Sequence, residues 1–224
     1  MKPQFSLYLM SRIQYLQISL GLTITLLSSC MSKKQEMNQQ EKEVEHDRLN
    51  VAVLEDRFKF KNLAEFSIDT LDWEERNTVY QKLDSLSFFQ IHQDTSPNRF
   101  AQYDDLSENF FHSKQSGSRG LIEFTILSQS EGEYCDQIDY SIFSKEGRLI
   151  SRFKVAGSCG DGGYYETAFG RFINDSAYEL LSEDNYKSED ALGVNTITYK
   201  RTLTNIKHDG TIVQSDTVLK ESIK

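Results

Sequence analysis

Short strand-like runs in the second half of this 224-residue chain constrain its fold most strongly. From Leu121 onward the sequence changes to a strand-like pattern. The predicted strands are Leu121–Gln129, Gln137–Ser144, Arg148–Ala156, Tyr164–Ile173, Ala177–Leu181, Thr196–Ile206 and Thr211–Leu219. Turn-forming residues separate several of them, for example Lys145-Glu146-Gly147 and His208-Asp209-Gly210. Short turns join neighbouring strands antiparallel, so the pattern predicts a meander.

An amphipathic helix is predicted before these strands. Apolar residues recur at helical spacing between residues 72 and 86, namely Trp73, Val79, Tyr80, Leu83 and Leu86. Either Thr70 or Asp72 can cap this helix, whose first turn contains Glu74 and Glu75. Phe88–His92 is predicted as a short strand. The polar stretch Gln93–Arg119 is predicted as a long connection that either binds a ligand or contains a short helix near Asp105.

These elements define the predicted fold class as α+β. We expect an antiparallel meander of about six to eight strands, packed with the N-terminal helix over residues 72–86. An all-β sandwich and a lipocalin-like curved sheet are the alternatives. The 14 Phe and 11 Tyr residues supply enough apolar surface for a core.

The first thirty residues have the features of an export signal. The uncharged run Ile18–Leu27 follows Arg12 and is too short to span a membrane; Met10 is an alternative start. Leu27-Ser28-Ser29-Cys30 resembles the lipobox of bacterial lipoproteins. This resemblance covers only the signal region. It implies cleavage before Cys30 and lipidation of its thiol, and several acyl chains would hold the protein stably on a membrane.

The same resemblance implies a location and a domain plan. Met31 rather than Asp follows the cysteine, which in a two-membrane bacterium favours the outer membrane of the cell envelope. We expect a signal peptide at residues 1–29, a lipid-anchored flexible tether at 30–48 and a single domain at 49–224. Because the tether sequence has mixed charge and no aromatic residue, it cannot bury enough apolar surface to offset the entropy lost on ordering.

The charge balance bears on partners. With 34 acidic against 25 basic residues, the net charge is −9, and phosphate binding depends on clustered Lys and Arg. We therefore expect no nucleic-acid partner. An acidic chain also gains nothing from electrostatic adhesion to anionic lipid, so the N-terminal lipid is the expected link to the membrane.

Two cysteines remain once Cys30 is lipidated. Cys135 and Cys159 form an even pair, as is typical of an oxidising compartment, and Gly147 is equidistant from them in the sequence. Both then lie at the open end of one hairpin. Simple pairing around the turn leaves them one residue out of step, so the predicted disulfide requires a β-bulge near Gly157. The alternative is a pair of reduced, buried cysteines.

No motif in the sequence specifies a reaction, so we assign no catalytic residue, metal or cofactor. Four glycines lie within residues 157–163, but the stretch has no Lys and contains Asp161, which disfavours a phosphate site. We interpret it as a conformationally demanding loop between two strands; the alternative is a binding edge that includes Asp161, Tyr164 and Tyr165. Four carboxylates on the predicted strands are candidates for a catalytic pair: Glu123, Asp136, Asp139 and Glu166.

The predicted function is accordingly a lipid-anchored binding or interaction module of the cell envelope, without enzymatic activity. Its partner would be a protein, a glycan or a small ligand. Two alternatives stay open. One is a hydrolase of envelope polymers that uses a carboxylate pair, and the other is a periplasmic inhibitor or immunity-type protein with an acidic patch for a basic target.

Overall fold

The computed structural model describes residues 48–50, 54, 56–93, 107–130, 134–187 and 195–223. The chain divides into two units, Met1–Asp47 and Arg48–Lys224, and all described residues belong to the second. The predicted signal peptide, the lipidation site Cys30 and the tether up to residue 47 lie outside the described residues. Where the chain is described, it contains no helix with the length and apolar character needed to cross a membrane.

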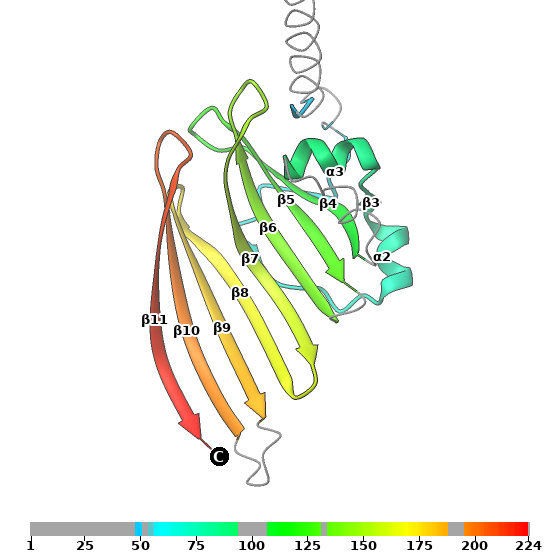
Figure 1. Ribbon diagram of the computed structural model, residues 1–224. Coiled ribbons are helices and arrows are strands. Elements are labelled where there is room, and N and C mark those ends of the chain that lie inside the picture. Colours follow the sequence, from blue (N-terminus) through cyan, green and yellow to red (C-terminus); the bar gives the residue numbers. More distant parts are fainter. Residues whose placement is uncertain are drawn as a thin grey trace, which may run out of the picture. The chain divides into compact units, whose positions relative to one another are not determined.

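The described part of the chain is mainly β-structure and forms one sheet of eleven strands (Figure 1). Eight long strands follow one another as an antiparallel meander: β4 (Ser107–Gln115), β5 (Ile122–Ser130), β6 (Cys135–Phe143), β7 (Leu149–Asp161), β8 (Tyr164–Asn174), β9 (Ala177–Lys187), β10 (Asn195–Ile206) and β11 (Ile212–Ile223). Three further strands have two residues each: β1 (Phe60–Lys61), β2 (Glu65–Phe66) and β3 (Gln81–Lys82). The seven strands predicted from residue 121 onward correspond to β5–β11. The predicted total of six to eight strands was too low.

Strand β4 was predicted as part of a long polar connection, and this prediction was wrong for residues 107–115. Phe110 and Phe111 are both fully buried, although they point to opposite faces of the sheet. A strand that is covered on both faces lacks the alternation of apolar and polar residues by which half-exposed strands are recognised.

The predicted single helix is two short helices, α2 (Trp73–Val79) and α3 (Ser85–His92). Asp72 caps α2 as predicted, and it forms a reciprocal capping box with Glu75. The chain between the helices is extended, because β3 pairs with Phe110 and Phe111 of β4. Asp84 then caps α3 by accepting a hydrogen bond from the Ser87 N–H at 2.7 Å, so the predicted strand at Phe88–His92 is instead helical.

The segment from β1 to β2 closes part of the sheet into a ring. β1 pairs in parallel with β4, and β2 pairs antiparallel with β8 at Gly170 and Arg171. Residues Gly157–Asp161 of β7 are the only ones that pair with β8. At Gly170 and Arg171, toward the end of β8, the neighbouring strand is β2 instead of β7. Six segments therefore form a hydrogen-bonded circuit: residues 60–66, β4, β5, β6, β7 and β8.

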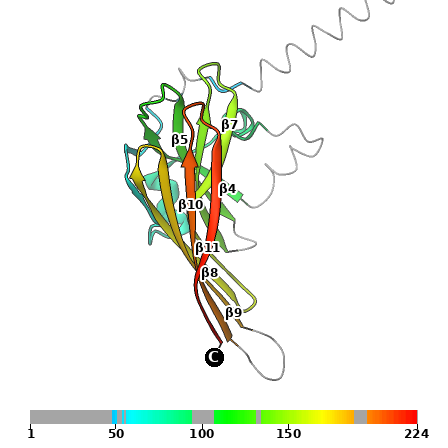
Figure 2. The same cartoon turned by 90° about the vertical axis from the view of Figure 1, so that its left-hand side faces the viewer.

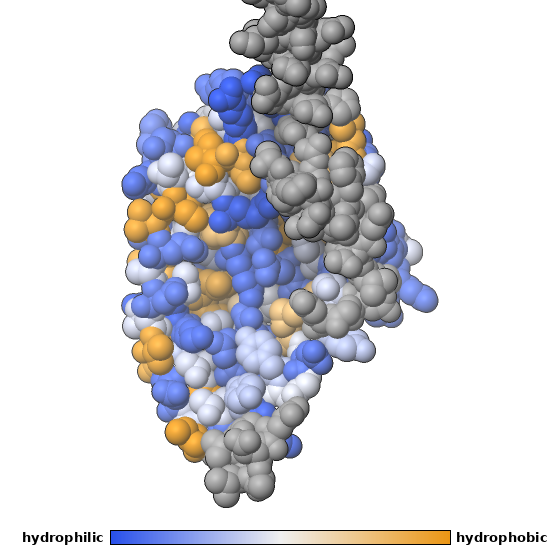
Figure 3. Space-filling view, viewed as in Figure 1, coloured by the Kyte–Doolittle hydropathy of each residue, from blue (hydrophilic) through white to orange (hydrophobic). Residues whose placement is uncertain are grey.

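Two apolar cores lie on the two faces of this sheet. The first fills the ring and includes Phe66, Phe110, Tyr140, Phe153 and Tyr178. The second lies between the other face of β4–β6 and helix α3, and it includes Phe88, Ile91, Phe111, Phe124 and Phe143. Beyond these cores, β8–β11 extend past the two helices in both views (Figure 1, Figure 2). On the face shown in Figure 3, apolar residues of this extension are separated by hydrophilic ones.

Cys135 and Cys159 are direct cross-strand partners at disulfide distance, with their Cα atoms 4.1 Å apart. Tyr140 pairs with Phe153, but Ile138 pairs with Ala156, which leaves Val155 as an extra residue on β7. This bulge lies two residues before the predicted position. It shifts the register by one residue and brings the cysteines opposite one another.

Candidate functional site

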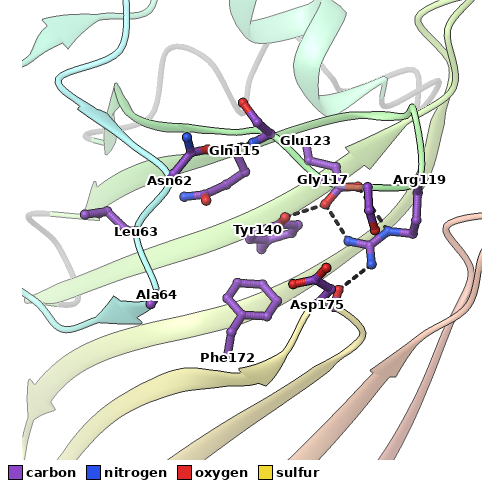
Figure 4. Close-up of a pocket in the computed structure, with 12 residues that line it drawn as sticks. Asn62, Leu63, Ala64, Gln115, Gly117, Arg119, Glu123, Tyr140, Phe172 and Asp175 are labelled. Carbon is purple, nitrogen blue, oxygen red and sulfur yellow. Dashed lines mark hydrogen bonds and ion pairs between the residues drawn. The ribbon is translucent and has the colours of Figure 1, made fainter.

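A pocket of about 340 Å³ opens at the end of the ring where the β4–β5 and β8–β9 turns lie (Figure 4). Its walls come from three connections: residues 62–64 between β1 and β2, residues 115–119 after β4, and Asp175 in the β8–β9 turn. Glu123, Tyr140 and Phe172 form its inner surface. The volume is at the small end of the range for ligand sites, roughly 300–1,000 Å³.

A buried ion pair lies at the base of this pocket. The Arg119 side chain is 6% exposed and the Glu123 side chain 0%. Arg119 donates from Nε and Nη2 to the two carboxylate oxygens of Glu123, at 3.1 and 2.7 Å. The Tyr140 hydroxyl donates to Glu123 Oε2 at 2.5 Å, and Arg119 Nη1 donates to the backbone oxygen of Asp175. The pair therefore links β5, β6 and the β8–β9 turn with charge-assisted hydrogen bonds.

Arg119 and Tyr140 keep fixed protonation states at neutral pH. Burial raises the pKa of the Tyr140 phenol above its ordinary value, and the negative charge of Glu123 raises it further. Burial by itself would lower the pKa of Arg119, but the hydrogen bonds and the charge of Glu123 outweigh that effect and raise the pKa. Both groups hold their protons at neutral pH, so neither can act as a general base there.

Local backbone features bring the walls together. A Cβ added to Gly117 would lie 2.4 Å from Glu123 Oε1, so only glycine lets the β4–β5 connection pass this close to the carboxylate. Asn62 has a left-handed backbone with φ of 53°, which asparagine tolerates better than most residues. Its N–H donates to the Lys114 carbonyl, and its Oδ1 accepts from the Ser116 N–H at 2.8 Å. These contacts tie the closing segment to the pocket rim.

The remaining polar atoms of the pocket can reach a ligand. Gln115 donates through Nε2 to Ser113 Oγ at 2.9 Å, which leaves its Oε1 as an acceptor. Within the described residues, Gln115 Oε1, Asn62 Nδ2 and the Asp175 carboxylate form no hydrogen bond. The rings of Tyr140 and Phe172 pack edge to face, with centroids 5.4 Å apart, and supply an apolar wall. The arrangement suits binding of a ligand that is polar on one side and apolar on the other.

The predicted binding residues Asp161, Tyr164 and Tyr165 lie at the other end of β8, around the β7–β8 turn. All three are exposed. Tyr164 pairs across the sheet with Tyr186, and its hydroxyl donates to Glu166 at 3.2 Å. Burial raises the pKa of Tyr164 to about 12, with Glu166 adding to the shift. Because side chains alternate along a strand, Tyr165 points to the opposite face. The binding edge at this turn stays a prediction, and the structure places it apart from the pocket.

The four carboxylates considered for a catalytic pair do not all converge on one place, although Asp139 and Glu166 both lie near Lys154. Glu123 lies in the pocket with Arg119. Asp136 accepts from Arg76 at 2.8 Å, and Asp139 accepts from Gln137 Nε2 at 2.7 Å. Glu166 is paired with Lys154. No three His, Cys, Asp or Glu side chains of the described segments are grouped so that they could hold a metal ion.

Sequence reasoning identified Glu123 but missed Arg119 and Tyr140. One signal was present, since Glu123 occupies an inward position of β5 that otherwise carries Thr125 and Leu127. A charged side chain in such a position requires a buried partner.

The chain matches no family model, and neither a curated protein nor a solved structure matches it.

Proposed function

We propose that this chain is a non-enzymatic binding protein of the bacterial cell envelope, and that the pocket beside Arg119 and Glu123 is its ligand site. The proposal rests on the two different roles of the polar groups in this pocket. The buried charges are matched to each other, whereas Gln115, Asn62 and Asp175 keep polar atoms for a ligand. A rigid base with an adaptable polar rim is typical of binding sites.

The membrane link in this proposal rests on the lipobox-like sequence Leu27-Ser28-Ser29-Cys30. A lipid on Cys30 would hold the protein on a membrane, with the outer membrane favoured by Met31. The described domain supplies the binding site, and the membrane is contacted through the N-terminal lipid. A hydrolase is less well supported, because each of the candidate carboxylates has its own polar partner.

A thermal-shift screen of the purified full chain against chemically diverse small fragments tests the ligand site. Ala64 is exposed and lines the pocket, so Ala64→Trp would fill part of it without replacing a member of the ion pair. Ala64→Ser is the matched control at the same position. We expect at least one fragment class to stabilise the wild-type protein and the Ala64→Ser variant but not Ala64→Trp. If no fragment binds, or if every hit survives Ala64→Trp, the pocket is not the ligand site.

A further inference from the structure

We infer that the ligand of this pocket is a neutral, hydroxyl-rich molecule, namely a mono- or disaccharide unit. This inference rests on the proposed function and adds the chemical class of the ligand. Its first support is the charge of the lining. Arg119 is the only cation among the twelve lining residues, and its donors are directed to Glu123 and to the Asp175 carbonyl. The lining holds two carboxylates, Glu123 and Asp175, against this one cation, so its net charge is negative and the pocket disfavours an anionic ligand.

The second support is the mixture of hydrogen-bonding groups at the rim. The Asp175 carboxylate and Gln115 Oε1 can only accept, whereas Asn62 Nδ2 can only donate. A hydroxyl group both donates and accepts, so a ligand with several hydroxyls can bond to both kinds of group. An ammonium group has donors but no acceptor, and it would leave Asn62 without a partner. The rim therefore matches a diol better than a cation.

The third support is the apolar wall. Phe172 presents an aromatic ring to the pocket and packs edge to face on the buried ring of Tyr140, and Leu63 is among the lining residues (Figure 4). The Tyr140 hydroxyl is bonded to Glu123 and its ring is buried, so this residue supports Phe172 from behind. A sugar ring combines an apolar C–H face with hydroxyls at its edge, which corresponds to the two kinds of wall. The pocket volume of about 340 Å³ favours a short unit over a long chain.

Saturation-transfer NMR with the full chain tests this assignment. The probes are glucose, galactose and mannose, two N-acetylhexosamines, glucosamine as the cationic form, and glucuronic acid as the anionic form. We expect at least one neutral sugar to receive saturation from the wild-type protein and from Ala64→Ser but not from Ala64→Trp. Asp175→Asn should weaken binding of that sugar about tenfold, because a charged acceptor is lost. Asp216→Asn, the same change at an exposed position of β11 that does not line the pocket, should leave binding unchanged.

The possible results separate this inference from the proposed function. If the Ala64→Trp-sensitive hits of the fragment screen are other compounds and no neutral sugar binds, the pocket is a ligand site but the saccharide assignment is wrong. Preferred binding of glucosamine or of glucuronic acid at the same pocket overturns the assignment in the same way. If no compound of any class binds, both are wrong. Sugar binding that persists in Ala64→Trp and in Asp175→Asn refutes this location for the sugar.

Discussion

Replacing one member of the buried ion pair should destabilise the protein more than replacing both. Arg119→Met would leave the Glu123 carboxylate, whose side chain has no exposed surface, without its cation. Loss of one partner from a buried pair costs about 3–5 kcal/mol, whereas replacing the whole pair by apolar residues is often close to neutral. We therefore expect about 3–5 kcal/mol for Arg119→Met and a smaller cost for Arg119→Met/Glu123→Leu.

Thermal unfolding followed by far-ultraviolet circular dichroism measures this difference. For a domain of this size, about 1 kcal/mol shifts Tm by roughly 2–4 °C, so Arg119→Met should lower Tm by roughly 6–20 °C. Arg171→Met is the matched control. Arg171 is 64% exposed and lies 3.7 Å from Glu179, and exposed pairs of this kind contribute at most about 1 kcal/mol.

Two results would refute this reasoning. If Arg119→Met lowers the free energy of unfolding no more than Arg171→Met does, water screens the interaction between Arg119 and Glu123, and the ion pair at the base of the pocket is not buried. If the double variant loses the sum of the two single costs, Arg119 and Glu123 do not stabilise each other. Equal unfolding baselines for all variants would show that the sheet is retained, so that the comparison is between folded proteins.

Three further predictions concern other parts of the chain. Burial lowers the pKa of His112 to about 4. As the pH falls, His112 is therefore protonated in the unfolded chain before it is protonated in the folded protein. The free energy of unfolding should then decrease by about 3 kcal/mol between about pH 6.5 and pH 4. His112→Phe should flatten this part of a pH series of urea unfolding, whereas His208→Asn should leave it unchanged. Cys135→Ser/Cys159→Ser should lower the unfolding free energy by about 3.5 kcal/mol, because the cross-link is lost. The wild-type protein in reductant should be as unstable as this variant. Equal stability of the wild type with and without reductant would contradict the disulfide. Mass spectrometry of the membrane fraction should find a diacylated or triacylated peptide that begins at Cys30, and an intact Met1 or Met10 terminus there would contradict the anchor.

Not every predicted strand has a solvated face, since β5 is buried on both faces, but the clearest sequence signal comes from strands that do. In β8, the buried Ala168 and Gly170 alternate with the exposed Phe169 and Arg171, and this alternation reveals the strand. β4 gives no such signal because Phe110 and Phe111 are buried in different cores. The helical spacing of Tyr80 and Leu83 was misleading for a related reason, since these residues belong to the two cores and lie in the extended chain between the helices.

The candidate site was less predictable than the strands because its members come from different elements. Glu123 was recognisable as an acid on a strand, but its partner Arg119 reaches it from a turn, and Tyr140 reaches it from the neighbouring strand. The closing segment is still harder to find. A two-residue strand such as β2 has no period, and its pairing with β8 depends on where β7 ends its own pairing.

The pocket is a consequence of the separation of β7 from β8. Val155 lies beyond the last β7–β8 pair, and its carbonyl accepts a hydrogen bond from the buried Tyr178 hydroxyl at 2.7 Å. That contact requires glycine at position 170, where a Cβ would lie 2.4 Å from the Glu179 oxygen and 2.6 Å from the Tyr178 hydroxyl. Because the Tyr178 hydroxyl bonds to the Val155 carbonyl, that carbonyl needs no partner on β8, and β8 can pair with β2 instead. The segment that carries β2 then crosses to β4 and forms one wall of the pocket, so the irregular pairing that conceals the fold in the sequence also creates the site.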